Sequence, residues 1–237
     1  MSRNKAEIIK HDSDVQQVMP VTYEALPVEK QFFGIKAVAF DVYGTLVYIG
    51  DPRRPYRRLL SALNDMGRAS REDDGARMMS VDVGLAEAAE LLGTTLPGEV
   101  LQDLTVDLNE ELASISLFGD AIPAIRLLKD RGLRIGLCSN LAGPYAKPVE
   151  ALLPPLDAYA WSFAVGAVKP EPRMYSYLCD ALDASPEQVL MVGDTLSADY
   201  EGPRSFGMQA CHLARKRTSE ATVWISTLME IESLIGR

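Results

Sequence analysis

The stretch IKAVAFDVYGTL, residues 35–46, decides the fold. Its first six residues form a largely apolar run that ends abruptly at Asp41, which is typical of a strand buried on both faces of a parallel sheet. Gly44 follows, and the chain must turn there. An aspartate at a strand end more often caps a turn than attacks a substrate, so a catalytic Asp41 needs support from elsewhere in the chain.

The same pattern recurs downstream. The run LRIGLC (133–138) ends at Ser139 and Asn140, and QVLMVG (188–193) ends at Asp194. Because the carboxyl ends of parallel strands meet at one crevice, we expect Asp41, Ser139 and Asp194 to lie near each other.

Helix-like stretches separate these runs. We expect helices at 120–132 and 172–183. We also expect two further strands, at WSFAV (161–165) and MQACHL (208–213). Alternation of strands and helices implies right-handed βαβ crossovers. The expected fold is therefore α/β, a Rossmann-like parallel sheet core with helices on both faces.

One stretch breaks the alternation. Between Gly50 and Phe118 no strand is evident, whereas residues 83–92 and 99–115 have the pattern of amphipathic helices. A helical cap inserted after the first strand would leave and re-enter beside Asp41 and could cover the crevice. The predicted organisation is an N-terminal arm (1–34), a core (35–49 and 119–237) and a helical cap (50–118).

Composition narrows the function classes. The chain has 237 residues, of which 47% are hydrophobic and 24% charged, as in an ordinary globular protein. Its formal net charge of -9 disfavours nucleic acid and anionic membranes as partners. Three cysteines without CxxC spacing, and no long apolar run, suggest a cytoplasmic protein. The sequence sets no oligomeric state.

A basic cluster stands out against this acidic background. Arg53, Arg54, Arg57 and Arg58 lie in DPRRPYRRLL. We interpret them as a solvated helix face, with an anion site as the alternative.

Several residues near the predicted crevice suit an anionic substrate. Gly44 and Thr45 would let backbone N–H groups point at an anion. Ser139 and Asn140 could hold a phosphoryl or carboxylate oxygen, although taken without the other motifs a turn after the strand is the preferred explanation. Lys169, in GAVKPEP, could neutralise a carboxylate nucleophile and its substrate.

Two further carboxylates indicate a metal. Asp194 and Asp199 lie in VGDTLSAD, after a buried run. Bringing them close to Asp41 would cause strong mutual repulsion unless a cation lay among them, and hard oxygen ligands suit Mg²⁺. The competing explanation for Asp199 is a helix cap.

Taken together, four ordered motifs resemble those of the haloacid dehalogenase-like hydrolases: DVYGT, CSN, VKP and GDTLSAD. The resemblance runs from about Ile35 to the C-terminus. It implies that Asp41 is a covalent nucleophile and that Ser139 and Lys169 stabilise the reacting group. It further implies that Asp194 binds Mg²⁺, with Asp199 and the backbone carbonyl of Tyr43 supporting the metal.

One position departs from the family's phosphatases, which usually carry a second Asp, acting as general acid and base, where this chain has Tyr43. A phenol has a reference pKa of about 10 and is poorly matched to that role. The pattern DxYGT is instead similar to that of 2-haloacid dehalogenases, which displace halide without a metal. Dehalogenases, however, typically lack the acidic residue that Asp194 provides here.

Charge decides between these alternatives. Three clustered carboxylates facing a carboxylate substrate without a metal would be costly, whereas Mg²⁺ and Lys169 would balance them for a phosphate. We therefore favour a Mg²⁺-dependent phosphate monoester hydrolase with a small phosphorylated substrate. The alternatives are a metal-independent 2-haloacid dehalogenase and a catalytically weak binding protein.

Overall fold

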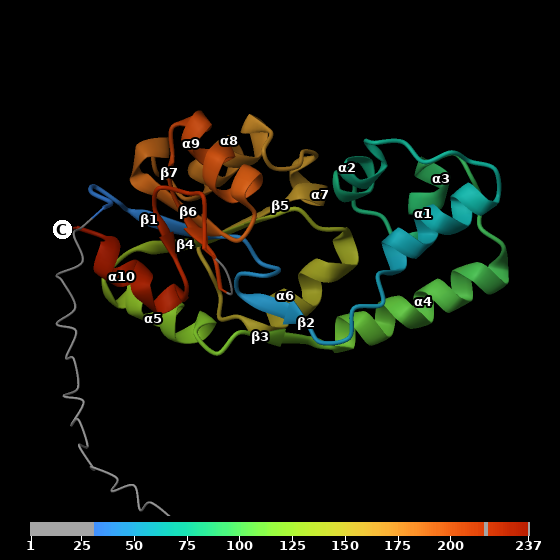
Figure 1. Ribbon diagram of the computed structural model, residues 1–237, viewed down its shortest axis with the longest axis horizontal. Coiled ribbons are helices and arrows are strands. Elements are labelled where there is room, and N and C mark those ends of the chain that lie inside the picture. Colours follow the sequence, from blue (N-terminus) through green and yellow to red (C-terminus); the bar gives the residue numbers. More distant parts are fainter. Residues whose placement is uncertain (1–30, 216–217, 237) are drawn as a thin grey trace, which may run out of the picture.

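A computed structural model describes residues 31–215 and 218–236 of the chain (Figure 1). The predicted N-terminal arm therefore lies outside the described residues except for 31–34. In that short part Phe32 is buried and pairs with Ile235 near the other end of the chain. Among the described residues, no helix is both long and apolar enough to cross a membrane.

A six-stranded parallel sheet forms the centre of the molecule. Its strands, in order across the sheet, are β5 (Ala158–Trp161), β4 (Arg134–Ser139), β1 (Ala37–Phe40), β6 (Val189–Gly193), β7 (Gln209–Leu213) and β8 (Trp224–Ile225). All four residues of β1 are fully buried, as its apolar run predicts. The strand order reverses at β1, between β4 and β6, which is where ligands bind in open α/β sheets.

Helices cover both faces of the sheet (Figure 1). One face packs against α5 (Ala121–Asp130), α6 (Ala146–Leu152) and α10 (Ile231–Leu234). The other packs against α7 (Ser162–Val165), α8 (Pro172–Ala181) and α9 (Gly202–Phe206). Short helical segments complete the core: the 3₁₀-helices η1 (Gly143–Tyr145), η2 (Pro186–Gln188) and η4 (Leu228–Glu230), and the π-helix η3 (Leu196–Glu201). The predicted α/β fold class is confirmed.

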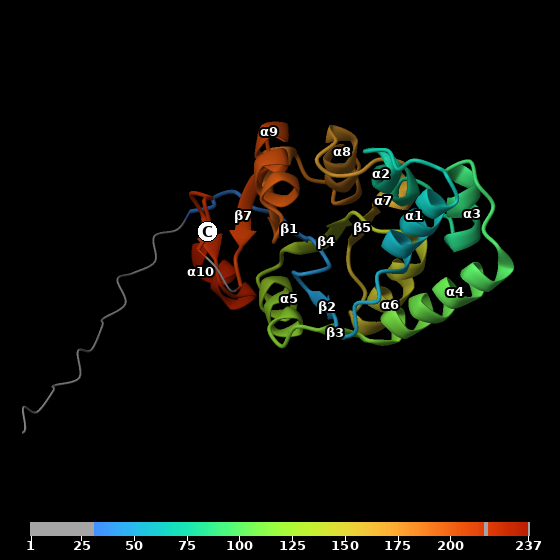
Figure 2. The same cartoon turned by 45° about the vertical axis from the view of Figure 1, so that its right-hand side comes forward.

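The helical insertion expected after the first strand is present, but a second short strand, β2 (Val47–Ile49), precedes it. It contains α1 (Pro55–Asp65), α2 (Asp74–Met79), α3 (Leu85–Leu91) and α4 (Gly98–Ala113), and lies at one end of the molecule (Figure 2). These helices enclose a hydrophobic core of their own, in which Leu59, Leu63 and Leu104 are almost fully buried. We call α1–α4 and their connecting loops the helical insertion.

Two local predictions were wrong. The segment 161–165 is not a strand, because the ladder with β4 ends at Trp161 and the chain continues as α7. Ser162 turns the chain by bonding the Leu141 backbone through both its hydroxyl proton and oxygen, and four apolar residues suit a buried helical turn as well as a strand. A short strand, β3 (Ile115–Leu117), also lies inside the stretch predicted to have none; it pairs antiparallel with β2 (Val47–Ile49).

Candidate active site

Polar residues from five segments meet at the carboxyl edge of the sheet. Asp41 follows β1, Ser139 ends β4, and Asp194 follows β6. Lys169 lies in the loop before α8, and Asp199 lies in η3. The three residues that the sequence placed at one crevice are brought together, with Lys169 and Asp199 beside them.

Lys169 links two carboxylates. Its Nζ donates hydrogen bonds to Asp41 Oδ1 at 2.8 Å and to Asp199 Oδ1 at 2.6 Å. Ser139 Oγ also donates to Asp41 Oδ1, at 3.1 Å. Asp199 and Ser139 are almost completely buried, and Lys169 is only 5% exposed. Charges this deeply buried require partners, and the lysine supplies one positive charge to two carboxylates.

The pKa values reflect this arrangement. Burial alone would lower the pKa of Lys169, but the carboxylates of Asp41 and Asp199 reverse that effect and raise it, so the ammonium is retained. Burial raises the pKa of Asp199, opposed by Lys169 and assisted by the like charge of Asp41.

Asn140 positions the lysine rather than the nucleophile. Its Nδ2 donates to the Lys169 carbonyl at 2.9 Å, and its Oδ1 accepts from the Lys169 amide at 2.7 Å. This pair of bonds fixes the loop that carries the ammonium group. Contact between Asn140 and a substrate stays a prediction.

Gly44 and Thr45 lie on the turn after β1. Gly44 has φ 87°, in the left-handed region that favours glycine. Thr45 is fully buried, and its Oγ1 has no hydrogen-bond partner among the described residues. The Thr45 carbonyl accepts from Arg215 at 2.7 Å, which ties the turn to the loop after β7.

The carboxylate cluster suits a hard divalent cation. Asp41, Asp194 and Asp199 each offer an oxygen, and these oxygens lie within 4.8 Å of one another. Partial burial, and then the charge of Asp41, raise the pKa of Asp194. One lysine cannot balance three carboxylates, and a set of oxygen donors is the kind that Mg²⁺ prefers. The residues present therefore fit the metal that the sequence predicts.

Tyr43 does not direct its hydroxyl at Asp41. The phenol donates to the Tyr145 carbonyl at 3.1 Å, and the two rings meet edge to face with centroids 5.8 Å apart. Burial, and then the charge of Glu111, raise the pKa of Tyr43. The Tyr43 phenol is thus even less suited to act as a general acid or base than the sequence alone implies.

The sequence missed a link between the core and the helical insertion. Tyr145 Oη donates to Glu111 Oε1 at 2.5 Å, and the Arg54 amide donates to Glu111 Oε2 at 2.5 Å. Glu111 is buried although it lies on α4, and so is Asp107 one turn earlier. Acidic residues on the apolar face of a predicted helix are the signal that could have revealed this link.

The basic cluster divides into two pairs. Arg53 forms ion pairs with Asp51, Asp107 and Glu110, and Arg58 pairs with Asp107. Arg54 and Arg57 instead line a pocket beside Tyr43. All four arginines are exposed, as the predicted solvated face requires, and Arg54 and Arg57 in addition border this pocket.

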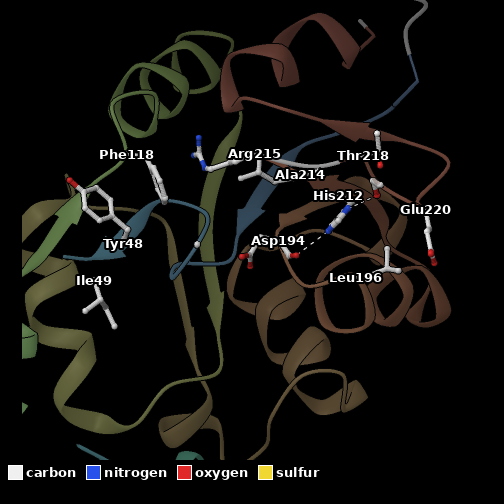
Figure 3. Close-up of a pocket in the computed structure, with 13 residues that line it drawn as sticks. Tyr48, Ile49, Phe118, Asp194, Leu196, His212, Ala214, Arg215, Thr218 and Glu220 are labelled. Carbon is white, nitrogen blue, oxygen red and sulfur yellow. Dashed lines mark hydrogen bonds between the residues drawn. The ribbon is translucent and has the colours of Figure 1, made fainter. Parts of the chain in front are cut away.

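Two pockets flank the carboxylate cluster. One, of about 850 Å³, opens past Gly44 and Asp194 and includes Arg215 and Glu220 (Figure 3). In it His212 Nε2 lies 3.0 Å from the Asp194 carbonyl. The other, of about 470 Å³, opens past Tyr43 and Asn140 and extends beneath the helical insertion.

Comparison with known proteins agrees with this geometry. The sequence profile of the haloacid dehalogenase-like hydrolase family matches residues 35–207. A phosphoglycolate phosphatase of Rhodospirillum rubrum is 31% identical over 182 residues, covering 68% of this chain and 72% of the relative. A phosphoglycolate phosphatase of Haemophilus influenzae is 26% identical, covering 68% of this chain and 77% of the relative.

Solved structures share the fold. A haloacid dehalogenase-like (HAD) phosphatase from Thermococcus onnurineus aligns with a TM-score of 0.58 at 24% identity, over 84% of this chain and 97% of that one. The L-2-haloacid dehalogenase of Xanthobacter autotrophicus aligns with a TM-score of 0.55 at 20% identity, over 84% and 98%. The fold is thus common to phosphatases and dehalogenases, while the phosphatase relatives in sequence favour phosphate chemistry. Because the family profile covers most of the chain, this protein belongs to the haloacid dehalogenase-like hydrolases.

Proposed function

We propose that this hydrolase is a Mg²⁺-dependent phosphatase that cleaves small phosphate monoesters through a phosphorylated Asp41. The observation that carries the proposal is the cluster of Asp41, Asp194 and Asp199, whose oxygens lie within 4.8 Å of one another around a single buried lysine. A dianionic phosphate could approach three carboxylates only if a cation reduced their charge.

The hydrogen bonds of Asp41 indicate which of its two carboxylate oxygens would attack the substrate. Oδ1 accepts from Ser139 and Lys169, whereas no hydrogen bond engages Oδ2 within the described part of the chain. Oδ2 would form a bond to phosphorus as the bond from phosphorus to the ester oxygen breaks. Water would then attack the aspartyl-phosphate, releasing inorganic phosphate and restoring the carboxylate.

Asp41, Asp194 and Asp199, with the backbone carbonyl of Tyr43, would hold the metal. Bound there, Mg²⁺ would neutralise negative charge on the phosphoryl oxygens and so favour attack by Asp41. Lys169 would contribute a second positive charge beside Asp41, and Asn140 would keep that lysine in place.

Phosphate-ester turnover tests the proposal. We expect the wild-type protein to hydrolyse phosphate monoesters with Mg²⁺, to lose the activity in EDTA, and to regain it when Mg²⁺ is restored. Asp41→Asn should abolish turnover, whereas Asp130→Asn, which changes an exposed carboxylate on α5, should not. Turnover that survives EDTA or Asp41→Asn would refute the proposal.

A 2-haloacid dehalogenase is the second candidate, favoured by one observation, the tyrosine at position 43. In that reaction Asp41 would displace halide from carbon and no proton would be needed on the leaving group. Asp194 argues against it, because its carboxylate would face a carboxylate substrate. Halide release from 2-chloropropionate measures this activity directly, and metal-independent release abolished by Asp41→Asn would make this the better assignment.

A further inference from the structure

The pocket beside Tyr43 has a wall that contains three tyrosines. Tyr43, Tyr56 and Tyr145 line it together with aliphatic and methionine side chains, among them Leu60, Met78 and Met79. We call it the tyrosine pocket. It reaches from the loop that carries the proposed nucleophile to helices α1 and α2 of the helical insertion.

The tyrosines present their rings rather than their hydroxyls. Tyr145 lies between the other two, with ring centroids 5.8 Å from Tyr43 and 6.1 Å from Tyr56. All three hydroxyls donate to protein oxygens: Tyr43 to the Tyr145 carbonyl, Tyr145 to Glu111, and Tyr56 to the Val83 carbonyl at 3.3 Å. Because the tyrosine hydroxyls are already used within the protein, the rings that remain suit an aromatic ligand better than a sugar.

The lining of the pocket also carries a net positive charge, from two arginines and one glutamate. Arg54 and Arg57 line it, and neither guanidinium forms an ion pair with another described residue. The Glu111 carboxylate at the same wall is occupied by the Tyr145 hydroxyl and the Arg54 amide. The larger pocket differs, since it is lined by Asp194 and Glu220 while its Arg215 is held by Asp120 through two bonds of 2.9 Å. An anionic group of the substrate would therefore bind in the tyrosine pocket in preference to the larger pocket.

The environment of Tyr43 limits which leaving groups can depart readily from the phosphate ester. Because the Tyr43 hydroxyl donates its proton to the Tyr145 carbonyl, it is not available to protonate an alkoxide that departs beside Asp41. A phenolate departs without that help far more readily, because a phenol has a pKa of about 10 against about 16 for water and similar hydroxyls. The need for a good leaving group and the aromatic wall of the pocket thus both favour an aryl phosphate ester.

We infer that the substrate is an aryl phosphate that carries a second anionic group. Its ring lies in the tyrosine pocket, and its second anion contacts Arg54 and Arg57. In turnover the bond from phosphorus to the aryl oxygen breaks and the phenolate leaves, taking its proton from solvent. This inference rests on the proposed phosphatase function for its catalytic part, but the binding part can be tested separately.

Turnover of matched esters tests the catalytic part. We expect 4-(carboxymethyl)phenyl phosphate to exceed phosphoglycolate in kcat/KM by at least about tenfold, since the ring is removed from water in the pocket. It should exceed 4-ethylphenyl phosphate, a neutral ester of similar leaving group, by about fivefold. Equal kcat/KM values for the three esters would overturn the inference while leaving the phosphatase function intact.

Binding of phosphonates, which cannot be hydrolysed, tests the pocket even if no ester is turned over. In calorimetry with Mg²⁺, 4-(carboxymethyl)benzylphosphonate should bind at least about tenfold more tightly than methylphosphonate. Arg54→Met and Arg57→Met should each weaken its binding by about fivefold, without changing the binding of methylphosphonate. Arg126→Met, a control at an exposed arginine of α5, should leave both affinities unchanged.

Two outcomes of the binding experiment would overturn the inference. The first is equal affinity for the aryl phosphonate and methylphosphonate in the wild-type protein. The second is an effect of Arg126→Met as large as that of Arg57→Met, because net charge rather than the pocket would then explain the affinity. Tight aryl binding without turnover of any phosphate ester would instead support the pocket and refute the phosphatase function.

Discussion

The carboxylate of Asp194 lies directly against the α-carbon of Gly44. A side chain at position 44 would begin inside the Asp194 carboxyl group, because an added Cβ overlaps both its oxygen and its carbon. The two residues come from the ends of adjacent strands, β1 and β6. Glycine at position 44 therefore serves both the left-handed turn and the placement of a proposed metal ligand.

Gly44→Ala should displace Asp194 and reduce phosphatase kcat by about 100-fold, the scale expected when a reacting group moves by about 1 Å. Gly67→Ala is the matched control, because Gly67 has φ 89° but open space around its α-carbon. Both variants bear similar backbone strain, but only Gly44→Ala should weaken Mg²⁺ binding in calorimetry. Equal losses of activity in the two variants would show that strain, not the clash with Asp194, is responsible.

Lys169 should stabilise the fold as well as the proposed reaction. Lys169→Met would leave Asp41 and Asp199 buried together without a cation, which we expect to lower the free energy of unfolding by about 3 kcal/mol or more at pH 7 without Mg²⁺. Adding Asp199→Asn should restore part of that loss, since it removes one of the two charges. Urea unfolding of the wild type, both single variants and the double variant measures the coupling, and purely additive effects would contradict the shared ion pair.

Tyr43 gives a prediction that separates a structural role from proton transfer. Tyr43→Phe should retain phosphatase kcat within about threefold, because the hydroxyl is bound to the Tyr145 carbonyl and its raised pKa suits it poorly to proton transfer at neutral pH. Tyr43→Asp should raise kcat for alkyl phosphates, which need a protonated leaving group, more than for aryl phosphates. A large loss in Tyr43→Phe would instead assign the hydroxyl a part in the chemistry.

The strand ends were predictable because burial and polarity change there within one residue. The apolar runs before Asp41, Ser139 and Asp194 fix three strands, and parallel topology alone then brings their ends together. Together with Lys169 and Asp199, these residues form the motif pattern that indicates the family from the sequence alone. What no local pattern showed is that Lys169 bonds two carboxylates at once, since this depends on how two loops pack.

The short elements, and the contacts between the core and the helical insertion, could not be predicted from the sequence for similar reasons. The three residues of β3 become a strand only through their pairing with β2, and α7 and β5 share one apolar segment that fits either structure. The bond from Tyr145 to Glu111 joins side chains 34 positions apart, on the core and on α4. The boundaries proposed for the arm, the core and the cap stay predictions.

A buried ion pair in the helical insertion gives a prediction about pH. Arg68 donates to both oxygens of Asp74, one of them at 2.6 Å, and the Arg71 amide donates to the same carboxylate at 2.8 Å. The hydrogen bonds from Arg68 are the main cause that lowers the pKa of Asp74 to about 2. Because the folded-state pKa lies below the unfolded value of about 4, the pair stabilises the fold above pH 4.

That stabilisation should be lost as the pH falls from about 4 through about 2, where the carboxyl group becomes protonated in the folded state too. Asp74→Asn should therefore lower the free energy of unfolding at pH 7 by roughly 2 kcal/mol, and by progressively less below pH 4. Asp73→Asn is the control, since Asp73 is exposed and adjacent in sequence. Urea unfolding at pH 7 and at pH 3 measures both, and a loss in Asp74→Asn that does not shrink in acid would show that packing, rather than the charge of Asp74, accounts for its contribution.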